Sequence, residues 1–188
     1  MKRPLIIAEP KIQSPFGYKS DKSFIELLDI AEEVGDIISV HTDHAWGGSL
    51  GSLGLVRKHT KKPILAKAPY LFDWQVQQCI DLGADYVLSI AYENMKNSHQ
   101  IMWEPLSLYG LSSVLKTLIL PPKKIVWNSR KLNDGTRKKE TIEDVRKIWK
   151  GWLCQASNIR TWDDVHPDVD AILVGEHLPQ FAKELRYP

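Results

Sequence analysis

The sequence predicts an α/β fold built on a parallel sheet, and two observations lead to this prediction. Short β-type runs alternate with amphipathic helical segments along most of the chain. The runs are continuously apolar rather than alternating, which is typical of parallel strands buried on both faces. Repeated βα units of this kind form either an open doubly wound sheet or a closed (β/α)8 barrel.

The first half of the chain gives the clearer pattern. We expect a helix over 23–35, because Ser23 can cap it and Glu26 stands three residues on, at capping-box spacing. The helix over 72–83 ends at Gly83. The remaining elements expected in this half are strands over 5–11, 36–42, 63–69 and 84–91, and a further helix over 51–60.

The second half contains one difficult region. The segment "WEPLSLYG" (103–110) is a candidate strand, and "LSSVLKTLIL" (111–120) is a candidate helix or strand. The other predicted strands are 123–129, 152–157 and 170–176, with a helix over 141–151 begun by Thr141 and a short helix at most over 161–169.

The eight strand candidates occupy a short chain. It has 188 residues, against about 250 for a typical barrel of this type. We therefore expect a single domain over 1–188, with one element very short between Tyr92 and Pro122 and another between Asn158 and Asp168.

Composition limits the function classes. The net charge of +2 argues against a nucleic-acid partner, and no apolar run approaches the roughly 20 residues that cross a membrane. Cys79 and Cys154 lie far apart with no CxxC pairing, as in a protein of a reducing compartment. We expect a cytoplasmic protein, monomeric or homodimeric, with no cofactor and a phosphorylated small molecule as ligand.

Polar residues follow the apolar runs, where the carboxyl ends of parallel strands meet and ligands bind. Such residues also occur at strand ends simply because these are exposed to solvent. Lys11 and Lys67 are stronger candidates, since each follows an apolar run and precedes a turn with proline. The set as a whole suits an anionic ligand; it consists of Glu9, Lys11, Thr42, Asp43, Lys67, Asn128, Ser129, Arg130, Ser157, Gly175 and Glu176.

Two further motifs have weaker functional interpretations. The segment "HTDH" (His41 to His44) contains metal-ligand residue types, but metal sites usually need a third protein ligand and supporting hydrogen bonds. The basic loop 130–140 is either a solvated loop or a lid that steers anions.

The sequence resembles the indole-3-glycerol-phosphate synthase family of (β/α)8 barrels in seven segments that occur in the same order. The segments are "IIAEPKIQSPFG" beside the family's "IIAExKxxSPSxG", "ISVHTDHAWGGSLGSLGLVR" beside "ISVLTDxxxFxGSLxxLxxVR", "PILAKAPYLFDWQV" beside "PVLxKDFIxDxYQI", "CIDLGADYVLSIA" beside "AxxxGADAxLLIA", "IVWNSRKL" beside "IGINNRDL", "ASNIRTWDDV" beside "ESGIxTPEDV" and "DAILVGEHL" beside "DAVLVGEAL". The match is poor over 92–122, and the family's N-terminal helical extension is expected to be missing because the first strand begins at Leu5.

The resemblance implies a role for each matching residue. Lys67 takes the position of the lysine that protonates the leaving hydroxyl during ring closure. Lys11 takes that of the lysine on the substrate carboxylate, and Glu9 holds both lysines. Further residues are implied in binding: Asn128, Ser129 and Arg130 for the substrate, and Ser14, Ser157, Asn158, Gly175 and Glu176 for its phosphate.

The departures from the family pattern concern acidic residues. Aligning "WEPLSLYG" with the family's "MEPLIEIN" puts Leu108 at the position of the catalytic glutamate base, four residues beyond Glu104. Ala68 and Ala156 stand where the family has two other acids, and Asn158 replaces a glycine. Synthase activity is therefore expected to be very weak or absent.

Three functional hypotheses follow. The chain is a shortened synthase-like lyase acting on a phosphorylated, ribulose-derived substrate, or a protein that binds a sugar phosphate or nucleotide without turnover. The third hypothesis is an enzyme of altered specificity, in which Lys67 or Lys11 acts as base or Schiff-base nucleophile. A carboxylate within reach of the lysines would favour the first.

Overall fold

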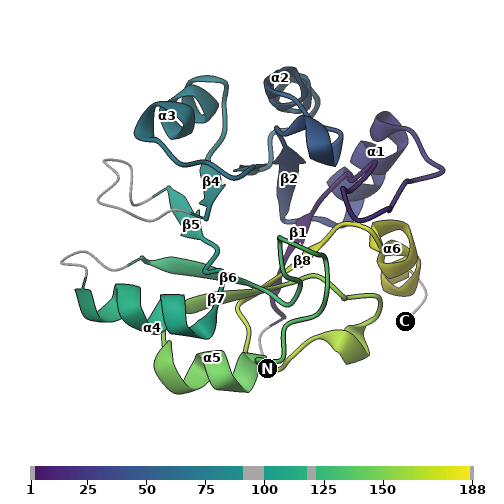
Figure 1. Ribbon diagram of the computed structural model, residues 1–188. Coiled ribbons are helices and arrows are strands. Elements are labelled where there is room, and N and C mark those ends of the chain that lie inside the picture. Colours follow the sequence, from purple (N-terminus) through teal and green to yellow (C-terminus); the bar gives the residue numbers. More distant parts are fainter. Residues whose placement is uncertain (1–2, 91–99, 118–121, 187–188) are drawn as a thin grey trace.

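Eight parallel strands close into one barrel in the order of the chain (Figure 1). The computed structural model describes residues 3–90, 100–117 and 122–186. The strands are β1 (Leu5–Ala8), β2 (Ile37–His41), β3 (Ile64–Lys67), β4 (Tyr86–Ser89), β5 (Ile101–Trp103), β6 (Lys124–Asn128), β7 (Trp152–Ala156) and β8 (Ala171–Val174). The closed order confirms the (β/α)8 barrel and excludes the open sheet.

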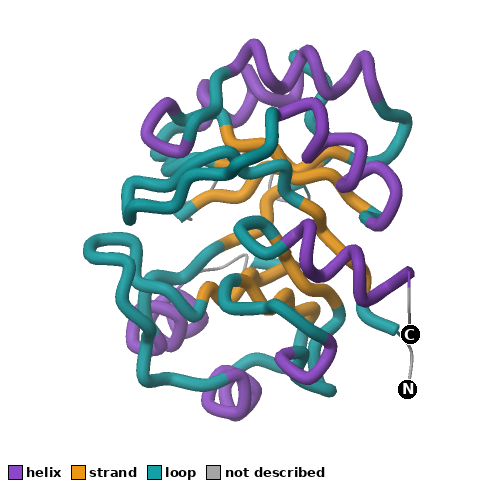
Figure 2. The backbone as a smooth tube through the Cα atoms, turned by 90° about the vertical axis from the view of Figure 1, so that its right-hand side faces the viewer, coloured by secondary structure: helices purple, strands orange, loops and turns teal. Residues whose placement is uncertain are grey.

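Helices surround the barrel on the outside. They are α1 (Phe24–Val34), α2 (Leu50–His59), α3 (Asp73–Asp81), α4 (Leu108–Thr117), α5 (Ile142–Ile148) and α6 (Leu178–Arg186), with short 3-10 helices η1 (His44–Trp46) and η2 (Trp162–Asp164). In Figure 2 the ends of the chain lie on the side of the molecule opposite the long loops. Those loops follow the carboxyl ends of the strands, where the candidate site was expected.

Successive side chains along each strand alternate between the barrel interior and the helix layer. Ile7, Leu65 and Val126 belong to a cluster inside the barrel. Their neighbours Ile6 and Ile64 belong to a second cluster that the helices cover. This parity assigns a direction to every strand residue, including those at the carboxyl ends.

The barrel is shortened where helices are reduced, as predicted. Between β7 and β8 the described chain forms only the three-residue η2 in place of a full helix. Strand β5 is also three residues long. The part of the prediction that concerns 92–99 and 118–121 lies outside the described residues.

The prediction of a strand over 103–110 is wrong. The strand β5 ends at Trp103, and Leu108 begins helix α4. Pro105 has no N–H to donate to a sheet and so favours an end to the strand. Ser107 then accepts a hydrogen bond from the backbone of Gly110 at 3.0 Å, which stabilises the start of the helix.

Candidate active site

Three ionisable residues point inward at the carboxyl ends of alternate strands. Glu9 follows β1, Lys67 ends β3 and Glu104 follows β5. Each stands two residues beyond an interior residue of its own strand, namely Ile7, Leu65 and Met102. Residues from alternate strands share one layer in a barrel of this type, so these three side chains meet in one place.

Glu9 is the buried centre of the site, with 2% of its surface exposed. Its Oε2 accepts a hydrogen bond from Lys67 Nζ at 3.2 Å and a longer one from Ser39 Oγ at 3.4 Å. Burial raises its pKa, but the positive charge of Lys67 leads a larger opposing effect, and the pKa falls to about 2. Glu9 therefore remains a carboxylate at neutral pH.

Lys67 remains protonated although it is buried. Burial alone lowers its pKa, whereas the carboxylates of Glu9 and Glu104 raise it by more, so the net shift is upward. A lysine that stays charged between two carboxylates can act as a proton donor, and it cannot act readily as a nucleophile.

A second ionic group joins β1, β6 and β8. Glu176 accepts a bidentate pair from Arg130, at 2.7 Å and 3.0 Å, and a third bond from Lys11 Nζ at 3.1 Å. Burial raises the pKa of Glu176, but the bonds from Arg130 and Lys11 lower it overall. The pKa of Lys11 is lowered, chiefly by burial.

Glu104 is held by a chain of hydrogen bonds from β6 and β7. Its Oε1 accepts a bond of 2.9 Å from Asn128 Nδ2, and Asn128 Oδ1 accepts one of 2.7 Å from Ser157 Oγ. These bonds fix the carboxylate on the same cavity as Lys67. The prediction that Leu108 occupies the base position is therefore wrong, because Leu108 belongs to α4 while Glu104 occupies the end of β5.

The loop after β7 has a left-handed backbone at two successive residues. Ser157 has φ of 69° and Asn158 has φ of 58°. Asparagine tolerates this conformation better than most residues, which explains how it can stand in place of the family's glycine. Its side-chain amide donates to Ser129 Oγ at 2.8 Å, so this loop is tied to the end of β6.

Gly175 allows close packing at the end of β8. A Cβ there would lie 3.0 Å from Glu9 Oε1 and 3.4 Å from Lys11 Cδ. Any side chain would therefore press on the charged groups of the site.

Two cavities open at the mouth of the barrel. The larger has a volume of about 210 Å3, and its lining includes the polar Lys67, Glu104 and Asn128 and the apolar Trp46 and Leu132. The smaller, of about 30 Å3, lies against Glu9, Lys11 and the loops after β7 and β8. Both cavities are lined by charged and by apolar side chains.

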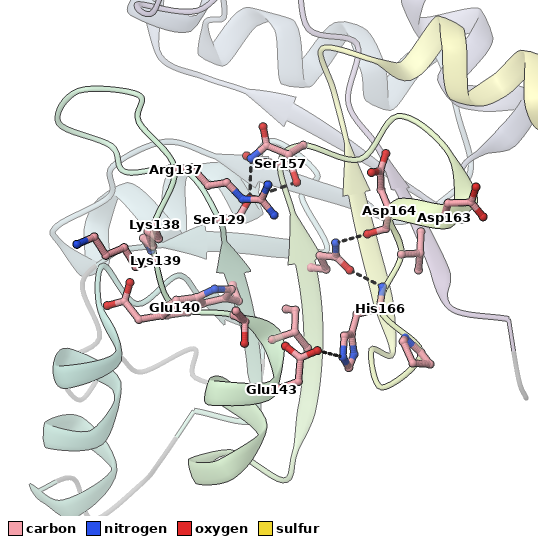
Figure 3. Close-up of a pocket in the computed structure, with 17 residues that line it drawn as sticks. Ser129, Arg137, Lys138, Lys139, Glu140, Glu143, Ser157, Asp163, Asp164 and His166 are labelled. Atoms are coloured by element: carbon pink, nitrogen blue, oxygen red, sulfur yellow. Dashed lines mark hydrogen bonds and ion pairs between the residues drawn. The ribbon is translucent and has the colours of Figure 1, made fainter.

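A larger hollow of about 590 Å3 lies outside the barrel, beside the reduced η2 connection (Figure 3). His166 and Glu143 pair across it at 2.8 Å. Ser129, Ser157 and Asn158 line it as well, so the hydrogen-bonded loop after β7 forms the wall between this hollow and the mouth. It contains neither Lys67 nor Glu104 and is distinct from the candidate site.

Most residues predicted from the sequence meet at the mouth. The residues that line its cavities are Glu9, Lys11, Lys67, Asn128, Arg130, Ser157, Asn158, Gly175 and Glu176. Ser129 lies behind them on the outer hollow. Ser14 lines neither cavity, and its Oγ accepts a bond from the backbone of Phe16 within its own loop.

Sequence reasoning missed Glu104, His41 and Trp46 as lining residues of the mouth. The alignment with the family put the end of the fifth strand four residues too late, at Leu108, and so passed over Glu104. His41 ends β2 and points into the barrel, as Ser39 does two residues before it. The alternation of side chains along a strand could have predicted this direction from the sequence. His44, by contrast, lies exposed in η1, so the "HTDH" segment does not gather its ligand types in one place.

Within residues 3–90, 100–117 and 122–186, no group of three metal-binding side chains is found. No helix in the described part of the chain has the length and hydropathy needed to cross a membrane.

The sequence is similar to those of known enzymes. The chain is 30% identical over 193 residues to indole-3-glycerol phosphate synthase of Priestia megaterium, covering 92% of this chain and 76% of that protein. It is 28% identical to the enzyme of the same name from Campylobacter hominis, over 83% of this chain and 67% of that protein. No family model matches the chain.

Solved structures support the fold. The 3-hexulose-6-phosphate synthase of Salmonella typhimurium superimposes with a TM-score of 0.70 at 13% identity, over 98% of this chain and 100% of that one. The 3-keto-L-gulonate-6-phosphate decarboxylase of Vibrio cholerae gives 0.60, also at 13% identity, over 98% and 96%. At this identity the likeness is evidence for the barrel alone.

Proposed function

Because the chain belongs to the indole-3-glycerol phosphate synthase family, we propose that it is a lyase acting on a phosphorylated, ribulose-derived substrate at the mouth of its barrel. The observation that carries the proposal is the presence of Lys67 and Glu104 on one cavity. These are the two residue types that ring closure requires, a protonated acid and a carboxylate base.

Two observations support one division of the roles. Lys67 is charged and lines the cavity, so in this proposal it donates a proton to the leaving hydroxyl. Glu104 accepts a hydrogen bond from the Asn128 amide, which orients its carboxyl group for the role of base. Glu9 holds Lys67 in place at 3.2 Å and acts as a positioning residue.

The phosphate of the substrate would bind on the smaller cavity, between the loops after β7 and β8. Backbone N–H groups at these two strand ends commonly form the phosphate site of such barrels. Ser157, Asn158 and Gly175 line this cavity, and the cations Lys11 and Arg130 line it as well. The substrate anion would compete with Glu176 for those cations.

A second candidate function is sugar-phosphate binding without turnover. Ala68 and Ala156 favour it, because both occupy positions where the family pattern has an acid. Ala68 lines the larger cavity and Ala156 ends β7 facing the interior. Neither alanine side chain can orient a substrate hydroxyl by hydrogen bonding.

Direct assay with carboxyphenylamino-deoxyribulose phosphate separates the two candidates. The sequence alone predicted very weak or absent activity, but because Glu104 and not Leu108 stands at the end of β5, we expect turnover by the unmodified chain. Glu104→Gln and Lys67→Ala should each lower kcat by about 10²–10⁴-fold. Glu143→Gln removes a carboxylate from the outer hollow and should leave kcat unchanged. Leu108→Glu should add no activity, because residue 108 lies in α4.

Binding of this substrate without turnover would contradict the lyase proposal and support the binding protein. For the phosphate, Ser157→Asp places a negative charge at the smaller cavity and should weaken sugar-phosphate binding. Unchanged affinity in that variant would contradict the proposal that the phosphate binds at this loop.

A further inference from the structure

His177 adds an ionisable side chain to the smaller cavity of the mouth. It stands between β8 and α6, and it lines this cavity together with Ser157, Asn158 and Gly175. The segment "DAILVGEHL" has histidine at this position, whereas the matching family segment "DAVLVGEAL" has alanine. Alanine has no polar side-chain atom, so the histidine gives the cavity a group that can gain a charge.

A hydrogen bond joins His177 to the loop after β7. Arg160 Nε donates to His177 Nε2 at 3.4 Å, and the backbone N–H of Arg160 donates to Asp164 Oδ2 at 2.8 Å. Because Nε2 accepts this bond, the neutral ring carries its proton on Nδ1. His177 is partly exposed and lines the cavity, so a ligand there can contact it.

Charged groups that follow three strands act on this imidazole. They are Arg160 and Asp164 after β7, Arg130 after β6 and Glu176 after β8. Burial is the main cause that lowers the pKa of His177, and the two arginines lower it further, whereas the two carboxylates oppose them. The net shift of the pKa is downward from 6.5, so the ring is mainly neutral at pH 7 before an anion binds.

A doubly charged anion in the smaller cavity would reverse this balance. Its negative charge would lie beside the imidazole and beside Lys11 and Arg130, which line the same cavity. An opposite charge within about 4–6 Å favours the charged form of a group and commonly moves its pKa by about 1–3. Once protonated, the ring has two N–H donors and a positive charge, and both strengthen its bond to an anion.

We propose that His177 takes up a proton when a doubly charged anion binds in the smaller cavity, so that the affinity of this site for the anion rises as the pH falls from about 8 to about 6. The effect is reciprocal, because the anion favours the proton by the same factor as the proton favours the anion. The inference rests on the proposed function in one respect, since that function places the substrate phosphate at this cavity. It goes beyond it by making anion capture depend on pH through a residue that the family pattern lacks.

The test uses sulfate, which keeps its double charge throughout this pH range, whereas a phosphate group loses its second proton near a pH of about 6. Calorimetry measures sulfate affinity at pH 6, 7 and 8 for the unmodified protein, His177→Ala and His177→Gln. We expect the unmodified protein to bind sulfate about tenfold more tightly at pH 6 than at pH 8, because uptake of one proton changes affinity by up to about tenfold per pH unit. Neither alanine nor glutamine can take up a proton here, so both variants should lose most of this dependence.

His59→Ala is the matched control. His59 lies on α2 and pairs with Asp29 at 3.2 Å instead of lining the cavity, so this variant should keep the pH dependence of the unmodified protein. Lys11 and Glu176 line the cavity in every variant. Only the difference between the pH dependences is therefore assigned to His177.

Proton uptake is also measured on the unmodified protein, by titrating sulfate at pH 7 in two buffers of different ionisation enthalpy. A fraction of a proton should be taken up per sulfate bound. The inference would be overturned by no uptake, by a pH dependence retained in either His177 variant, or by no sulfate binding at any of these pH values. The lyase proposal is tested separately by turnover of the aryl substrate, and sulfate binding that is independent of pH would leave that proposal standing.

Discussion

Glu9 favours the charged forms of its neighbours in the mouth. It lies within 3.5 Å of both Lys67 and His41, and it raises the pKa of Lys11 against the effect of burial. Without this carboxylate, burial would favour neutral lysines, and a neutral Lys67 could not act as an acid. The acidity proposed for the site thus depends on a residue that itself transfers no proton.

The buried imidazole of His41 should make stability depend on pH. The unfolded chain binds a proton at His41 near pH 6.5, whereas the folded chain does so only near pH 3, so the folded pKa is depressed. The stabilising effect is present above pH 6.5 and is lost as the pH falls from 6.5 toward 3. Between pH 7 and pH 5, His41 should lower the free energy of unfolding by about 2 kcal/mol.

Urea denaturation at pH 7 and pH 5, with and without His41→Leu, checks this expectation. Glu9 has its own depressed pKa of about 2, but its effect is lost mainly below pH 4.5, outside this window. The drop in stability should therefore be about 2 kcal/mol smaller in His41→Leu. An identical drop in the two proteins would show that His41 is not neutral in the folded state.

Individual site residues could be predicted where an apolar run ends in a charge. Lys11, Lys67 and Glu9 were found in this way, and the structure places all three on the mouth. Glu104 could not be predicted in this way, because its strand has only three residues and the match to the family over 92–122 is poor. The pairing of Arg130 with Glu176 could not be foreseen either, since it joins loops 46 positions apart in sequence.

At the scale of elements, long periodic segments were predicted well and short ones poorly. Helix α1 begins at its predicted cap, because Ser23 and Glu26 form a complete capping box. The segment 103–110 instead divides into the end of β5 and the start of α4. A run of five or six apolar residues has no period that distinguishes strand from helix, and only pairing with β4 and β6 fixes β5.

The capping box offers a test at this scale. Ser23 Oγ accepts a bond from the backbone of Glu26 at 3.3 Å, and Glu26 Oε2 accepts one from the backbone of Ser23 at 2.8 Å. Ser23→Ala should lower the free energy of unfolding by about 1 kcal/mol. Ser113→Ala is the matched control, because Ser113 lies exposed within α4, where alanine favours the helix. Thermal or urea denaturation measures both, and equal effects would contradict the capping argument.

For the whole molecule, closure of the barrel joins the two ends of the chain. Strand β1 pairs with β8 from Leu5 opposite Ala171 to Ala8 opposite Val174. Outside the barrel α1 and α6 pack together, and Arg186 pairs with Glu33. The site depends on this closure, because Glu9 and Lys11 come from the first strand end and Glu176 from the last.

Because the closed sheet leaves no subset of strands complete, we expect the described barrel to unfold in one cooperative transition. Far-ultraviolet circular dichroism reports the helices, while fluorescence reports tryptophans that include the buried Trp103 and Trp127 on β5 and β6. The two signals should give coincident urea curves.

Loss of a core contact in the last helix should therefore destabilise the whole molecule. Phe181 of α6 is fully buried and packs against the ring of Trp162, with centroids 5.1 Å apart. Phe181→Ala should cost about 3–5 kcal/mol and shift both signals together, although neither Trp103 nor Trp127 lies near the end of the chain. Phe72→Ala is the control, since Phe72 is 57% exposed and its loss should change stability by less than about 0.5 kcal/mol. If Phe181→Ala moved the dichroism curve and left the fluorescence curve in place, α6 would unfold separately from β5 and β6, and closure would not couple the ends of this chain.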